Sequence, residues 1–126
     1  MAKILVVDDE QLIRDIFSRI LESDGHTVTV ASDGEVGLQI LLREDFDLLV
    51  SDVEMAKPGY EMINEAGESV PPAIIMISGK MNYDGFQAGL ELMIVGAMEG
   101  RQVEFMSKPL RNITDLTDMA TKCLSG

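Results

Sequence analysis

The chain has 126 residues, of which 46% are hydrophobic and 25% are charged. This length supports one hydrophobic core and is too short for two, so we expect a single domain over residues 1–126. Ten basic and 22 acidic residues give a formal charge of −12, which argues against electrostatic binding of nucleic acid or of a membrane surface by this chain alone.

The first predicted element is a buried strand, residues 4–7, which ends at Asp8 and Asp9. An aliphatic run without polar alternation is typical of a strand covered on both faces, as in a parallel sheet. The apolar residues that follow recur at helical spacing and predict an amphipathic helix. Its expected buried face consists of Leu12, Ile13, Ile16, Phe17, Ile20 and Leu21.

Two strands and two helices are predicted next. Residues 26–30 alternate as a strand, and the turn at 32–34 leads into a helix. Residues 46–50 form a third strand that ends just before Asp52, and a turn at 58–59 opens a short third helix. The expected buried face of the second helix carries Val36, Ile40 and Leu41.

Residues 73–77 predict a fourth buried strand, residues 83–95 a helix and residues 103–106 a fifth strand. Asn112 is the expected N-cap of a final helix. That helix is expected to bury Ile113, Leu116, Met119, Ala120 and Cys123. Strand and helix alternate without an internal repeat or linker, which predicts an α/β doubly wound sheet with right-handed crossovers.

Polar residues follow the strands where each one ends, at Asp8 and Asp9, Asp52, Ser78 and Lys108. In a parallel sheet these ends share one edge, where ligands bind. Three carboxylates there would repel at roughly 4 kcal/mol per close pair. Mg²⁺ relieves such repulsion and prefers carboxylates, waters and phosphate oxygens. The alternative, that Asp8 and Asp9 only cap the next helix, leaves Asp52 unexplained.

These residues, in this order and including Pro109 after Lys108, resemble the receiver domain of two-component response regulators over essentially the whole chain. The resemblance implies a flavodoxin-like doubly wound sheet of five parallel strands in the order 2-1-3-4-5, with about five helices. It also implies a phosphorylation switch and not an enzyme, with slow self-dephosphorylation expected.

By this resemblance Asp52 accepts a phosphoryl group from a sensor histidine kinase or a phosphotransfer protein. A carboxylate nucleophile that forms an acyl phosphate is ordinary covalent chemistry. Mg²⁺ would be held directly by Asp9 and Asp52, through water by Asp8, and by the backbone carbonyl of Glu54. The cation would neutralise charge on the transferring phosphoryl oxygens.

Lys108 would pair with one phosphoryl oxygen and Ser78 would hydrogen-bond another. Phosphorylation adds roughly −1.5 to −2 charge, which would draw Ser78 inward. Phe105 matches the family's aromatic switch residue on the fifth strand, and the signal would pass to a downstream protein target. Each of these residues also has a plainer interpretation: Lys108 as a solvated lysine, Ser78 as a turn residue and Phe105 as a core phenylalanine.

The chain departs from the family's usual pattern in three places. A proline usually comes soon after the Met that follows the phosphoacceptor, but here Met55 is followed by Ala56, Lys57, Pro58 and Gly59, which indicates a shortened loop. The segment between Ser78 and Lys108 is long, and the third helix is short. These differences bear on the identity of the partners and leave the expected chemistry unchanged.

Other readings stay open. The chain could be a receiver excised from a longer regulator or hybrid kinase. It could also be a Mg²⁺-dependent phosphohydrolase, with Glu54 two residues after the nucleophile. A flavin binder is disfavoured because the first strand ends in carboxylates.

The location of the protein is also predicted from the sequence. It has one cysteine, no signal peptide and no apolar run of about 20 residues, which predicts a cytoplasmic protein that does not span a membrane.

Overall fold

The computed structural model describes residues 1–53, 55, 57, 59–78, 100–107 and 114–125. The strands are β1 (Lys3–Val7), β2 (Thr27–Ala31), β3 (Leu48–Asp52), β4 (Ala73–Ser78) and β5 (Gln102–Ser107). The described helices are α1 (Gln11–Ser23), α2 (Gly34–Arg43), α3 (Gly59–Ala66), a 3₁₀ turn (Gly67–Ser69) and α5 (Thr114–Ser125).

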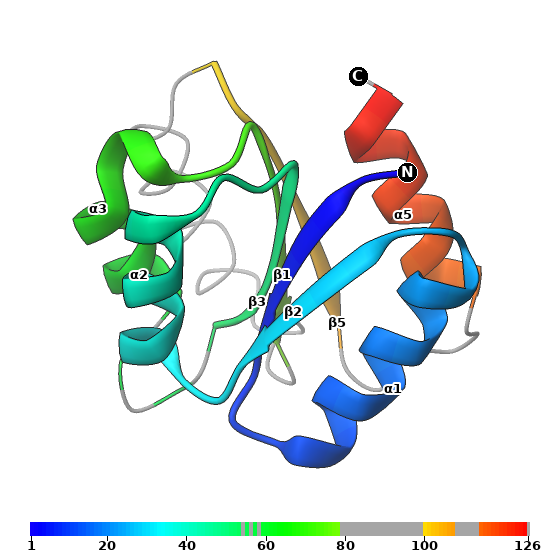
Figure 1. The fold of residues 1–126 in the computed structure, drawn as a ribbon, viewed down its shortest axis with the longest axis horizontal. Helices are drawn as coiled ribbons and strands as arrows, with labels where there is room; N and C mark the ends of the chain where they lie inside the picture. Colours follow the sequence, from blue (N-terminus) through cyan, green and yellow to red (C-terminus); the bar gives the residue numbers. More distant parts are fainter. Residues whose placement is uncertain (54, 56, 58, 79–99, 108–113, 126) are drawn as a thin grey trace.

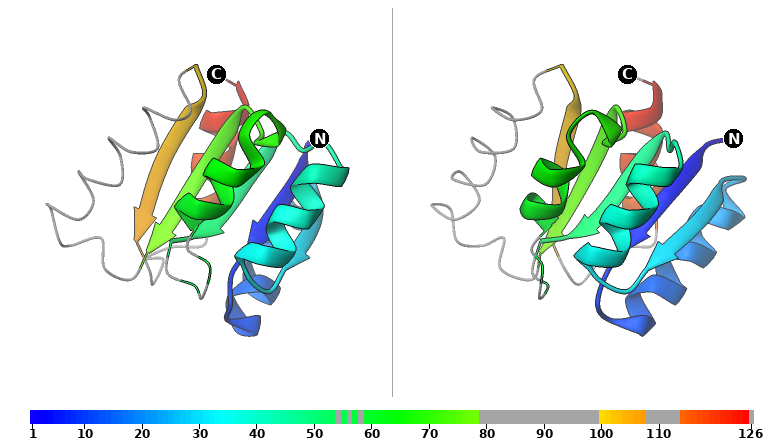
Figure 2. Two further views of the ribbon diagram at one scale, coloured as in Figure 1. Left: turned by 90° about the vertical axis from the view of Figure 1, so that its left-hand side faces the viewer. Right: turned by 60° about the vertical axis from the view of Figure 1, so that its left-hand side comes forward.

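The five strands form one parallel sheet in the order β2-β1-β3-β4-β5. Helices α1 and α5 cover one face of this sheet, and α2 and α3 cover the other (Figure 1). This arrangement confirms the prediction of a flavodoxin-like, doubly wound α/β fold. All strands run in the same direction, so their carboxyl ends meet at one edge (Figure 2).

Each strand contributes alternate side chains to two separate cores. On the α2/α3 face, Leu5, Leu49 and Ile74 are fully buried. On the α1/α5 face, Ile4, Leu48 and Ile75 pack against the two helices. Because both faces are covered, β3 and β4 are buried along their whole length. The uninterrupted aliphatic runs in the sequence predicted that both faces of these strands are buried, and the structure confirms this prediction.

Two predictions about the helices need correction. Leu12 and Ile16 of α1 are 69% and 39% exposed, and Val36 of α2 is 40% exposed. The face of α1 that packs on the sheet is narrower than expected and is formed by Ile13, Phe17, Ile20 and Leu21. The apolar residues beside it are left at the surface.

Most strand and helix boundaries lie within two residues of the prediction. The third strand begins at Leu48, two residues later than expected, and extends through Asp52. The turn residue Pro58, the expected helix at 83–95 and the expected N-cap Asn112 lie outside the described residues. Among the helices that the structure describes, none is both long and apolar enough to cross a lipid bilayer.

Candidate functional site

The register of the central strands brings Asp8 and Asp52 to the same edge of the sheet. Val7 of β1 pairs with Ser51 of β3, and the two aspartates each come one residue later. Asp52 in turn pairs with Ile77, so Ser78 ends β4 at the same level. The register therefore places all three residues at the carboxyl edge of the sheet.

These three polar residues are buried, which is unusual for their types. Asp8, Asp52 and Ser78 are 1%, 4% and 1% exposed. A buried carboxylate is costly unless it has hydrogen-bonding or charged partners. The edge of the sheet therefore holds two acids in an environment that strengthens their interaction with a cation or a polar ligand.

Hydrogen bonds around Asp8 hold the segment after β1. The backbone N–H of Asp8 donates to the carbonyl of Ala31 at 3.2 Å. Its Oδ1 accepts from the N–H of Glu10 at 2.8 Å, and its carbonyl accepts from Arg14 at 2.7 Å. This network turns the chain sharply from β1 into α1 and leaves Asp9 exposed.

Among the described residues, Asp8, Asp9 and Glu10 form a group whose carboxylate oxygens lie within 4.8 Å of one another. Such a set of oxygens suits a hard divalent cation such as Mg²⁺. Asp9 was predicted as a direct ligand and Asp8 as one that acts through water; Glu10 was not predicted, although its position directly after the acidic pair was a signal. Asp52 is not part of this group. The group therefore offers oxygen atoms of the kind that Mg²⁺ prefers. This geometry does not assign which residues bind the ion.

The backbone around Asp52 is fixed on both sides. The hydroxyl of Ser51, which is fully buried, donates to the carbonyl of Asp52 at 3.0 Å. The next N–H, that of Val53, donates to the carbonyl of Ile77 at 2.9 Å. These hydrogen bonds hold the backbone from which the Asp52 side chain extends. A reacting group needs such fixed placement.

Phe105 lies on β5 opposite Met76 and packs, half-buried, against the α2/α3 core. Its predicted place on the fifth strand is confirmed. Two other predicted site residues, Lys108 and Glu54, lie outside the described residues.

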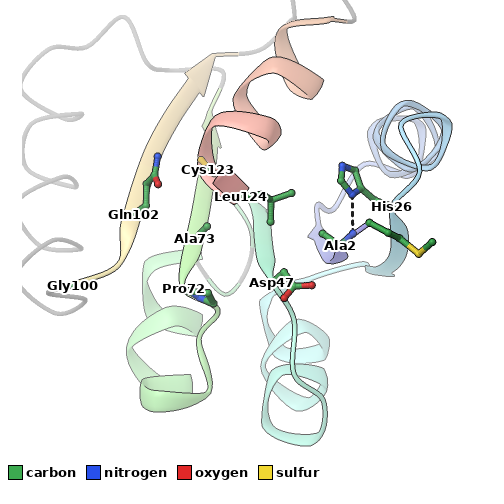
Figure 3. Close-up of a pocket in the computed structure, with 10 residues that line it drawn as sticks. Ala2, His26, Asp47, Pro72, Ala73, Gly100, Gln102, Cys123 and Leu124 are labelled. Carbon is green, nitrogen blue, oxygen red and sulfur yellow. Dashed lines mark hydrogen bonds between the residues drawn. The ribbon is translucent and has the colours of Figure 1, made fainter. Parts of the chain in front are cut away.

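A cavity of about 580 Å³ lies at the opposite, amino-terminal edge of the sheet. Figure 3 shows His26 beside Ala2, whose backbone N–H donates to Nδ1 of the imidazole at 3.1 Å. The remaining lining residues are Met1, Asp47, Pro72, Ala73, Gly100, Gln102, Cys123 and Leu124. None of the predicted site residues that the structure describes lines this cavity, so it is separate from the acidic edge.

Comparison with known proteins agrees with this geometry. The response regulator receiver domain family matches residues 4–120. A protein-glutamate methylesterase/protein-glutamine glutaminase from Symbiobacterium thermophilum is 31% identical over 115 residues, which cover 89% of this chain and 30% of the relative. The chain thus spans about a third of the length of that relative.

Two solved structures extend the similarity to the fold. A CheY-like receiver domain protein from Methanospirillum hungatei has a TM-score of 0.82 and 27% identity, over 99% of this chain and 94% of the other. The response regulator TrrA from Thermotoga maritima, solved in complex with Mg²⁺-BeF, has a TM-score of 0.78 and 28% identity, over 98% of this chain and 100% of the other.

Proposed function

The chain belongs to the response regulator receiver domain family, and we propose that it is a two-component signalling switch whose phosphoacceptor is Asp52. The observation that carries this assignment is the register of β1 and β3, which sets Asp52, 4% exposed, beside Asp8 at the carboxyl edge of the sheet. In an open parallel sheet this edge is where ligands bind.

The donor is a phosphohistidine on a sensor histidine kinase or a phosphotransfer protein. An Asp52 carboxylate oxygen attacks phosphorus as the P–N bond breaks, and the departing imidazole keeps the bonding electron pair and takes up a proton. The product is an acyl phosphate on Asp52. Lys108 would pair with a phosphoryl oxygen, and Ser78, buried at the end of β4, would hydrogen-bond another.

Mg²⁺ would be held by Asp9 and Asp52 directly, by Asp8 through water and by the backbone carbonyl of Glu54. The oxygen donors of the Asp8, Asp9 and Glu10 group fit this cation. When bound, Mg²⁺ would offset the negative charge of the approaching phosphoryl group. The N–H of Glu10 donates to Oδ1 of Asp8 and orients this carboxylate at the sheet edge.

The acyl phosphate would act as a conformational signal. It adds about −1.5 to −2 charge at the sheet edge, which would draw Ser78 inward and let Phe105 turn toward the core. Phe105 is half-buried against that core already, so a short movement would change the surface of β5. A downstream protein target would read this change, and the chain itself would act as a switch and not as an enzyme.

The phosphodonor would dock beside Asp9, over the exposed Leu12 and Ile16 of α1. These apolar side chains lie within two turns of the acidic group and do not serve the core. Exposed apolar residues next to a site are a common feature of protein interfaces.

We also propose that residues 1–126 form one receiver domain that works in the cytoplasm, without a nucleic-acid or membrane partner of its own.

The test is incubation of the chain with Mg²⁺ and acetyl phosphate, followed by intact-mass measurement. One added phosphoryl group is expected for the wild type and for Asp45→Asn, an acid at an exposed position. None is expected for Asp52→Asn or after removal of Mg²⁺ with EDTA. Equal labelling of Asp52→Asn, or labelling that ignores EDTA, would refute the assignment.

A second candidate is a receiver that forms part of a longer regulator. The fraction of the relatives that this chain covers favours it: 30% of the methylesterase relative and 47% of the transcriptional regulatory protein ResD from Bacillus subtilis, which is 32% identical. The length of the natural gene product decides this question. A phosphohydrolase would instead show steady turnover of an external phosphomonoester, which the same incubation can measure.

A further inference from the structure

Lys57 links two helices next to the proposed phosphoacceptor. Its ammonium lies 3.4 Å from Oε2 of Glu35, in the first turn of α2, and forms a second ion pair with Glu65 of α3. These two helices lie side by side on one face of the sheet (Figure 2). A single side chain from the segment between β3 and α3 therefore contacts both.

The backbone and stem of Lys57 also rest on the start of α2. A Cβ added at Gly34 would clash with the Lys57 carbonyl oxygen and would lie 3.0 Å from the Lys57 Cβ and 3.2 Å from its Cγ. Distances this short leave no room for a side chain at residue 34. Lys57 is thus seated on α2 by close packing, independently of the ion pairs.

Exposed ion pairs usually contribute little to stability. Here the side chain of Lys57 is only 20% exposed, although its partners Glu35 and Glu65 are 62% and 52% exposed. The hydrogen bond that Lys57 donates to Glu65, assisted by the charges of both glutamates, raises the pKa of Lys57. The Lys57 ammonium is therefore charged at neutral pH and is held between the two glutamates. We expect it to affect the position of the chain around Lys57 more than the free energy of unfolding.

We propose that Lys57 is a positioning residue that ties the chain after Asp52 to α2 and α3. The two ion pairs restrain its ammonium, and the packing on Gly34 restrains its backbone and stem.

This inference rests on the proposed function, because Lys57 lies between Asp52, a proposed Mg²⁺ ligand, and Gly59 at the start of α3. A segment that is already ordered loses less conformational entropy when a ligand binds. Release of Lys57 from its partners would therefore weaken Mg²⁺ binding. It would also loosen the hydrogen bond from the N–H of Gly59 to the carbonyl of Val53, 3.2 Å, which closes this segment.

The test replaces Lys57 with methionine, which keeps most of the apolar stem and removes the charge. The first measurement is the Mg²⁺ dissociation constant by isothermal titration calorimetry, expected to rise roughly threefold to tenfold, about 0.7 to 1.4 kcal/mol. The second is hydrogen exchange of the Gly59 N–H in the metal-free protein, expected to become faster. Lys57→Arg keeps the charge and should stay near the wild type in both.

Lys122→Met is the matched control, because Lys122 pairs with Glu104 on α5 and β5, away from this segment. It should change neither quantity. If Lys57→Met does not fold, the double variant Glu35→Gln/Glu65→Gln removes both partners and carries the same expectation. Mg²⁺ affinity and Gly59 exchange that match the Lys122→Met control would overturn the proposal. A wild type that binds no Mg²⁺ would refute the proposed function, while the exchange measurement would still decide the role of Lys57.

Discussion

Gly59 lies directly against the backbone of Asp52: a Cβ at residue 59 would be 2.6 Å from the Asp52 carbonyl oxygen. The same carbonyl accepts the hydroxyl of Ser51. The first residue of α3 therefore packs on the strand end that holds the proposed phosphoacceptor. Any side chain at residue 59 must displace either this strand end or α3.

We expect Gly59→Ala to lower the free energy of unfolding by about 1–3 kcal/mol, the usual cost of overpacking. The gain of about 0.5–1 kcal/mol that alanine brings to a helix is smaller. The added methyl would also meet the Met76 methyl, at 2.8 Å. Urea unfolding measures the effect, with Asn64→Ala on the exposed side of α3 as control. Equal stability of the two variants would contradict the close contact.

Two leucines of α1 should respond differently to truncation. Leu21 is fully buried, so Leu21→Ala should lower the free energy of unfolding by about 2–5 kcal/mol. Leu12 is 69% exposed, so Leu12→Ala should change it by less than about 0.5 kcal/mol. Leu12→Ala should nevertheless slow phosphoryl transfer from a kinase and leave transfer from acetyl phosphate unchanged. A loss of stability similar to that of Leu21→Ala would place Leu12 in the core.

The carboxylate of Asp33 caps α2. Its Oδ1 accepts from the N–H of Val36 at 2.9 Å. Loss of such a cap costs about 0.5–2 kcal/mol, so Asp33→Ala should lower the urea midpoint and Asp33→Asn should largely preserve it. Asp45→Ala, an exposed loop position, is the control. An alanine variant at residue 33 as stable as the asparagine variant would show that the cap does not contribute.

Burial, and secondarily the charge of Glu104, raises the pKa of the Cys123 thiol. Below about pH 8.5, the ordinary thiol value, the thiol is protonated in both folded and unfolded chains and makes no pH-dependent difference. Above it the unfolded chain loses the proton first, so stability falls as pH rises toward the raised pKa of the folded protein. Urea unfolding at pH 7 and pH 9.5 should show a larger loss for the wild type than for Cys123→Ala. A parallel loss in both would contradict this.

The architecture could be predicted from the sequence because strands that are buried on both faces consist of uninterrupted apolar residues. Residues 4–7 and 73–77 carry no polar residue, and the sequence becomes polar where the sheet ends. The buried face of α1 was less predictable. Leu12 and Ile16 have the same spacing as core residues, yet they are exposed. Helical periodicity shows which residues share a face and does not show how wide a stripe the neighbouring layer covers.

The acids of the site could be predicted, but the supports around them could not. Asp8, Asp52 and Ser78 follow from the strand ends alone. The roles of Gly34, Gly59 and Lys57 depend on where α2 and α3 approach the segment after β3, which is set by tertiary packing. The departure from the family's usual pattern between Met55 and Pro58 was visible in the sequence, but it did not indicate which contacts Lys57 makes.

The order of the strands has a consequence for how the chain acquires its structure. Lys3 pairs with Thr27, and Ile4 pairs with Leu48, so each described ladder joins strands that are separated by an intervening crossover. No strand can begin the sheet by folding back on its immediate neighbour as a hairpin. Such non-local pairing slows folding relative to helical bundles, and we expect the aspartate at residue 52 to become reactive only late, when most of the chain has assembled.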